Sequence, residues 1–169
     1  MRPSRLIWWF HDEGKSIEES INIIAATVYH QSMAPEVGAL ARKITEGCTT
    51  AMCKIRAIHE WLRKRFLYTE DPKEVDTFKS AVYTIHEIWQ NGYFRGDCDD
   101  ATILSAALLK AAGFVVRLMV VSRRPEPDAP LEHILTLVEL PGGKKVYVDL
   151  TVDTPIDFSR RRVVLSDPI

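Results

Sequence analysis

The chain has 169 residues, of which 46% are hydrophobic and 27% are charged, a composition typical of one compact domain with a buried core. Its 22 basic and 23 acidic residues leave a net charge of -1, which provides no general attraction to nucleic acid or to an anionic membrane. We therefore expect a single domain over residues 1–169 that binds neither of these partners.

The N-terminal half predicts a series of helices. The apolar run at residues 6–10 is too short for a signal-peptide core or a membrane span, and we interpret it as a short strand or an aromatic anchor. Ser16 and Glu19 have the spacing of a capping box, which predicts a helix directly after them. Pro35 suits the first turn of a second helix. A third helix is expected from about Thr50 to Arg65.

Three side chains of this half bear on chemistry and on the cellular compartment. Cys48 and Cys53 are five residues apart in a segment that we interpret as helical, where they would not face each other. With three cysteines in the chain, we expect no disulfide framework, and we predict a protein of a reducing compartment, the cytoplasm. His59 is interpreted as a surface or boundary histidine of the third helix.

The second half changes from helix to strand. A helix over residues 80–90 should end at Asn91-Gly92, and a longer apolar helix should end at Gly113. Strands and turns are expected after it. The strands are placed at 114–121, 133–140, 145–150 and 163–165, with a loop at 123–130 and a turn at 141–143. The basic run at residues 160–162 is interpreted as a solvated tail. The predicted fold class is α+β, with N-terminal helices packed on a C-terminal antiparallel sheet.

The segment between the two halves carries the candidate nucleophile. Gly96 and Asp97 lead into Cys98, which opens the apolar helix, and two further carboxylates follow at Asp99 and Asp100. Free N–H groups and the positive end of the helix dipole stabilise a thiolate and an oxyanion at such a position. The consecutive carboxylates are interpreted as a solvated helix start, with a weaker alternative as calcium ligands.

A base and an orienting group follow in the predicted strands. His133 and Asp149 are placed on one face of a hairpin if its loop has an odd number of residues centred on Pro141. The three residues then predict an acyl-transfer site, in which His133 activates Cys98 and Asp149 orients the ring. The Cys98 N–H is the expected first oxyanion donor. The candidates for a second donor are Trp61, Trp89, Gln90 and the favoured Tyr68.

These residues resemble the transglutaminase-like superfamily, papain-like thiol enzymes of circularly permuted arrangement. The resemblance rests on Gly-Asp-Cys-Asp-Asp-Ala at 96–101, the helix ending at Gly113, the strand begun by His133, and Tyr-Val-Asp-Leu-Thr at 147–151. It covers about residues 55–152, within a predicted core of about 50–152, and looks most like small phage or prophage members. It implies a catalytic triad of Cys98, His133 and Asp149.

The function expected from the residues and the resemblance is that of a thiol protease or amidase, which cleaves peptide or isopeptide amides of a protein or peptide substrate through a thioester. Transglutaminase-type amine transfer uses the same intermediate and stays open. A phage structural or assembly protein without activity is a further alternative. A zinc site formed by Cys98, His133 and Asp149 is also possible in principle, but zinc sites more often use closely spaced ligand pairs. No cofactor is expected.

Overall fold

We describe the protein from a computed structural model, which defines residues 7–10, 16–71, 76–126, 128–153, 157–159 and 161–169. These residues contain five α-helices, eight short strands and one 3₁₀ turn. In chain order they are β1 (Ile7–Phe10), α1 (Ile17–Ser32), α2 (Pro35–Ile44), α3 (Ala51–Arg63), β2 (Phe66–Tyr68), β3 (Asp76–Lys79), α4 (Ala81–Asn91), β4 (Phe94–Gly96), α5 (Cys98–Ala111), β5 (Val115–Ser122), β6 (Leu131–Glu139), η1 (Pro141–Gly143), β7 (Lys145–Val148) and β8 (Val163–Leu165).

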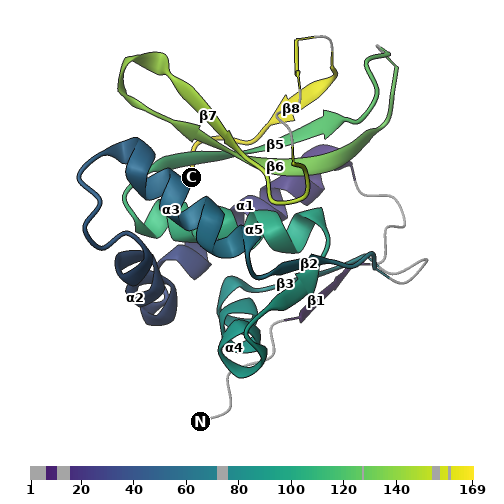
Figure 1. The fold of residues 1–169 in the computed structure, drawn as a ribbon. Helices are drawn as coiled ribbons and strands as arrows, with labels where there is room; N and C mark the ends of the chain where they lie inside the picture. Colours follow the sequence, from purple (N-terminus) through teal and green to yellow (C-terminus); the bar gives the residue numbers. More distant parts are fainter. Residues whose placement is uncertain (1–6, 11–15, 72–75, 127, 154–156, 160) are drawn as a thin grey trace.

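Four strands form the antiparallel sheet predicted from the C-terminal half, in the order β7-β6-β5-β8. Figure 1 shows this sheet on one side of α5, with the other helices on the same side of the sheet as α5. Helix α5 contacts each of the other helices as well as β5 and β6, and its residues from Asp100 to Leu109 are all buried. The α+β fold class and the central position of the cysteine helix are therefore confirmed.

Local sequence signals explain where the helices begin and end. The capping box is present, since the Glu19 N–H donates to Ser16 Oγ and the Ser16 N–H donates to the Glu19 carboxylate. Helix α4 ends at Gly92, which has a φ of 82° that other residues rarely adopt. Ile21, Ile24 and Val28 recur at helical spacing along α1, and all three are buried.

Two small sheets were not predicted. Strands β1 and β3 pair antiparallel, and β2 and β4 pair parallel. A short strand or an aromatic anchor was expected at the position of β1, whereas β2, β3 and β4 have only three or four residues each, too few for a sequence pattern. The parallel pair positions the start of α5, because β4, which pairs with β2, leads directly into that helix.

The β6–β7 hairpin has the odd loop that the prediction required, with one correction. Its five loop residues, 140–144, are centred on Gly142 and not on Pro141, because Thr136 pairs with Val148 and Glu139 pairs with Lys145. The shift arises from a tight turn in which Gly142 and Gly143 both have positive φ, 80° and 78°. An odd loop keeps His133 and Asp149 in phase on the two strands, although they are not directly opposite each other.

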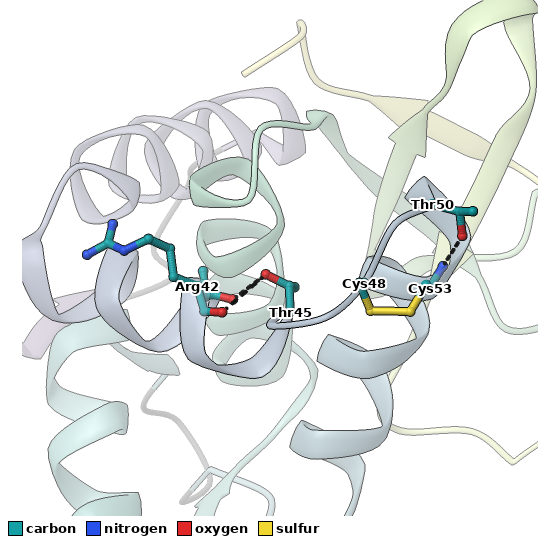
Figure 2. The surroundings of a disulfide bond; sticks show 6 residues. Arg42, Thr45, Cys48, Thr50 and Cys53 are labelled. Carbon is teal, nitrogen blue, oxygen red and sulfur yellow. Dashed lines mark hydrogen bonds between the residues drawn. A yellow bond between two sulfur atoms is a disulfide. The ribbon is translucent and has the colours of Figure 1, made fainter.

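A disulfide joins Cys48 and Cys53, so the prediction of no disulfide was wrong (Figure 2). Helix α3 begins only at Ala51, with Thr50 as its N-cap, so Cys48 lies outside the helix and the chain can turn back toward Cys53. The two Cα atoms are 5.4 Å apart, a usual separation for a disulfide. The expectation of a reducing compartment loses its basis, because disulfides persist mainly in oxidising compartments.

The basic run near the C-terminus is not simply a solvated tail. Arg161 donates through Nη1 to the carbonyls of Ser122 and Arg123, and so ties this segment to the end of β5. Arg162 is exposed, and residue 160 lies outside the described residues. In the part of the chain that the structure defines, no helix has the length and apolar character needed to cross a membrane.

Candidate active site

Cys98 is the first residue of α5 and directly follows the N-cap residue Asp97. The parallel pairing of β2 with β4 places Tyr68 beside Gly96, and the Thr69 N–H donates to the Gly96 carbonyl at 2.8 Å. The Asp97 carboxylate accepts from the Asp99 N–H at 3.0 Å, as an N-cap side chain does. The predicted position of the cysteine at a helix N-terminus is therefore confirmed.

Asp100 is not part of a solvated helix start, which corrects the sequence interpretation. Its carboxylate is buried and accepts from the backbone N–H of Lys79 at 2.6 Å. Burial raises the pKa of Asp100 to about 7, although the Lys79 N–H opposes this shift. A Cβ on Gly96 would lie 2.5 Å from the Asp100 Cβ, so the glycine is needed for this close approach. Gly96 and Asp100 thus fix how α5 leaves β4.

His133 and Asp149 form a tight pair at the start of β6 and just beyond the end of β7. His133 Nε2 lies 2.6 Å from Asp149 Oδ2, and the other carboxylate oxygen accepts from the Thr151 N–H and hydroxyl at 2.8 and 2.7 Å. Burial alone would raise the pKa of Asp149, but His133 and Thr151 outweigh it, so that pKa is lowered. An ionised carboxylate only accepts hydrogen bonds, so the proton of the ring lies on Nε2.

The second ring nitrogen is the one suited to act as a base. His133 Nδ1 is buried and has no hydrogen-bond partner among the described residues. Because Nε2 carries the proton, Nδ1 presents a free lone pair. His133 and Cys98 line the same cavity, which has a volume of about 280 Å³. Its other walls are residues of α1, the acidic residues beside Cys98, and apolar residues of β5 and β6.

The surroundings of Cys98 do not favour a resting thiolate. Burial raises the pKa of the thiol above its usual range, and the neighbouring carboxylates of Asp99 and Asp97 raise it further. The backbone of Ile134 and the cation of Arg123 lower it by less. The Cys98 thiol points toward Asp99 Oδ1, with a sulfur to oxygen distance of 3.7 Å. The sequence had suggested that the helix N-terminus would stabilise a thiolate, but desolvation and two carboxylates outweigh that effect.

Tyr68 lies near the site but does not line the cavity of Cys98. Its side chain is 46% exposed and lines a second hollow, which also contains His133. The Tyr68 hydroxyl is in contact with Arg123 and raises the pKa of that guanidinium. Its role as an oxyanion donor stays a prediction.

The geometry does not favour either of the two metal sites, for calcium or for zinc, that the sequence left open. Asp97, Cys98 and Asp99 each offer one ligand atom within 4.8 Å of the others, whereas the calcium candidate Asp100 turns its carboxylate to the Lys79 N–H. A thiol is a soft ligand, while calcium prefers oxygen. A zinc site formed with His133 and Asp149 does not fit, because their side chains bond to each other instead of facing a shared ion.

His59 has a role that the sequence did not indicate. It is half-buried, as a boundary histidine should be, but its Nε2 lies 3.1 Å from the backbone carbonyl of Asp149, 90 residues away. One helical turn further along α3, Arg63 forms an ion pair with Asp153. Helix α3 therefore contacts the segment that carries Asp149 at two points. The spacing of His59 along its helix could not predict this contact, because Asp149 is distant in the sequence.

The fold places a cysteine at the start of a buried helix and a histidine–aspartate pair on an antiparallel sheet, and the cysteine and the histidine line one cavity. The chain belongs to the transglutaminase-like superfamily, whose family model matches residues 38–150. No functionally curated protein matches the sequence significantly.

Two solved structures are similar in fold. A candidate protease from Parabacteroides distasonis matches with a TM-score of 0.62 and 14% identity over 86% of this chain and 30% of its own. A candidate cysteine protease from Cytophaga hutchinsonii matches with a TM-score of 0.54 and 18% identity over 87% of this chain and 54% of its own. The present chain thus corresponds to about a third to a half of these larger chains.

Proposed function

We propose that this protein is a cysteine-dependent hydrolase that cleaves peptide or isopeptide amides through a thioester on Cys98. The observation that carries the proposal is the state of the His133 ring. Asp149 fixes one ring nitrogen at 2.6 Å, and the other nitrogen is buried without a partner in a cavity that Cys98 also lines. A general base needs this combination of a fixed tautomer and a free lone pair. The similarity to candidate proteases agrees with it.

The raised pKa of Cys98 determines the first step. The resting cysteine is a thiol, so His133 Nδ1 removes its proton as the sulfur attacks the substrate carbonyl. The charge that develops on the carbonyl oxygen is stabilised by the Cys98 N–H at the helix start, with the Tyr68 hydroxyl as a candidate second donor. Asp149 stabilises the imidazolium that forms.

The remaining steps return every group to its starting state. The His133 imidazolium gives its proton to the leaving amine, the carbon–nitrogen bond breaks, and a thioester remains on Cys98. His133 then takes a proton from water, the resulting hydroxide displaces the sulfur, and the proton passes back to the thiolate. If an amine replaces water in this step, the product is a new amide, so transglutaminase-type transfer is the alternative outcome of the same intermediate. A phage assembly role remains an expectation from the sequence.

Trapping of the acyl-enzyme tests the proposal. The purified protein is mixed with 4-nitrophenyl acetate, a neutral activated ester, and peptide mapping by mass spectrometry locates the acetyl group. We expect acetylation of Cys98 in the wild type, its loss in Cys98→Ala, and a large reduction in His133→Ala. Water or an added alkylamine should then release the acetyl group, and the released product distinguishes hydrolysis from transfer. Equal acetylation of Cys98 in the wild type and in His133→Ala would refute the proposed base.

A further inference from the structure

A second hollow, of about 360 Å³, adjoins the proposed site and shares His133 with it. The two hollows differ in chemistry. The cavity of Cys98 is lined by apolar residues and by three carboxylates, those of Asp97, Asp99 and Glu132. The second hollow contains two guanidinium groups and one carboxylate, and its lining includes Tyr68, Glu70, Arg123, Thr151 and Arg161. A substrate that passes His133 would therefore meet opposite charges on its two sides.

One of the two arginines is committed to the backbone. Arg161 donates to the carbonyl oxygens of Ser122, Arg123 and Asp157. These bonds hold the residue that follows β5 in place, and Arg123 is that residue. Arg161 thus fixes the backbone at Arg123, whose own side chain is exposed at the rim of the hollow.

The guanidinium of Arg123 is available to bind a substrate group. None of the described carboxylates forms an ion pair with it, including that of Glu70 in the same hollow. Its guanidinium forms a hydrogen bond with the Tyr68 side chain and is influenced by the charge of Glu132, and its own charge acts on the Cys98 thiol. A guanidinium whose backbone is fixed, whose charge reaches the Cys98 thiol and which forms no ion pair with a described carboxylate is suited to bind a substrate carboxylate.

We propose that this hollow is a subsite for a carboxylate of the acyl donor, bound by Arg123 beside His133. The inference rests on the proposed function and adds to it the class of substrate, an amide whose acyl part carries an acidic side chain near the reacting carbonyl. Glu70 sets the selectivity of the subsite, since its carboxylate opposes a second negative charge. If the test below shows instead that the hollow favours a cationic side chain, the proposal is overturned.

Two pairs of reagents that differ in charge measure the subsite without knowledge of the natural substrate. The first pair is iodoacetate and iodoacetamide, which alkylate Cys98 with and without a carboxylate. The second pair is mono-4-nitrophenyl succinate and its methyl ester, which acylate Cys98 with and without a free carboxylate on the acyl chain. The measured quantity is the ratio of the anionic to the neutral rate at Cys98, because the ratio cancels any change in the amount of thiolate.

We expect Arg123→Gln to lower both ratios by about fivefold, the effect of one unit charge a few ångströms away in a partly hydrated site. Arg123→Lys should restore most of the ratio, and Glu70→Gln should raise it. Arg124→Gln is the matched control, because Arg124 is exposed like Arg123 but lines neither hollow. Its ratios should stay within about twofold of the wild type, since solvent screens a charge at that position.

The possible results distinguish a failure of the proposed subsite from a failure of the proposed function. Ratios that are unchanged in Arg123→Gln, or that rise, overturn the subsite even if both esters acylate Cys98. If neither ester acylates Cys98, the proposed function fails, and the alkylation ratio alone still decides whether Arg123 attracts a carboxylate. A fall of the ratio in Arg124→Gln equal to that in Arg123→Gln would assign the effect to general surface charge and would also overturn the subsite.

Discussion

The two halves of the candidate site are organised in different ways. On the sheet side, His133 and Asp149 are connected by hydrogen bonds to Thr151 and to helix α3, and these contacts fix the tautomer of the ring. On the helix side, Cys98 has carboxylates on both sides that oppose its ionisation. In the proposed mechanism, the base is therefore organised before substrate binds, whereas Cys98 stays a thiol until its proton is removed.

The largest expected effect on the acylation rate comes from a change to the histidine–aspartate pair on the sheet side. Asp149→Asn should reduce acylation of Cys98 by 4-nitrophenyl acetate by about 10³-fold, because the ring loses the carboxylate that fixes its tautomer. Asp153→Asn is the control, since Asp153 is an exposed carboxylate of the same segment and is paired with Arg63. Stopped-flow release of 4-nitrophenolate gives both rates. Similar rates in the two variants would show that Asp149 is not part of the machinery.

The next prediction concerns how the helix half is built. Gly96→Ala should lower the free energy of unfolding by about 3 kcal/mol, because a Cβ at this position overlaps the buried Asp100 side chain. Gly38→Ala is the matched control, because its Cβ would meet only the end of the Arg42 side chain, at 3.3 Å. Urea unfolding should show the control at or above wild-type stability. Equal stabilities would mean that Asp100 can move away from Gly96 at little cost.

A smaller change tests the electrostatics of Cys98. Asp99→Asn removes a carboxylate that raises the thiol pKa, so the pH midpoint for alkylation by iodoacetamide should fall by about one unit. Asp128→Asn, an exposed carboxylate in the loop after β5, should leave the midpoint unchanged. A midpoint that does not move in Asp99→Asn would assign the raised pKa to burial alone.

The smallest expected effect tests the contact between α3 and the segment of Asp149. His59→Leu removes the donor to the Asp149 carbonyl and should slow acylation by about threefold, with an altered pH profile. His59→Gln keeps an N–H donor at a similar position and should recover most of the rate. If both variants behave alike, His59 contributes packing and not the position of Asp149.

Sequence reasoning succeeded where a local pattern has one structural meaning. The capping box at Ser16, the stop at Gly92 and the odd hairpin loop each follow from a few neighbouring residues. The same local features, the hairpin parity and the helix start, led to the prediction of Cys98, His133 and Asp149 as a site; the structure pairs His133 with Asp149 and places Cys98 and His133 along one cavity. The family match over residues 38–150 agrees with the resemblance found in the sequence.

The errors share a different cause, which is dependence on contacts distant in sequence or on the boundary of an element. The disulfide was missed because Cys48 was treated as helical, although it lies before the helix that starts near Thr50. Asp100 was placed in solvent because its partner, the Lys79 N–H, belongs to a strand of only four residues with no clear pattern. The raised pKa of Cys98 depends on burial, which the charged neighbours in the sequence do not reveal.

The central claim is that His133 is the base for Cys98, and the pH dependence of Cys98 alkylation by iodoacetamide tests it most directly. Mass spectrometry gives the rate at Cys98 in the wild type and in His133→Ala. Wild-type Cys98 should already react at neutral pH, because His133 accepts the thiol proton as the sulfur attacks the reagent. Cys98 of His133→Ala should react only well above the pKa of an ordinary thiol, ~8.5. Coincident profiles would contradict the claim, because Cys98 would then ionise independently of His133.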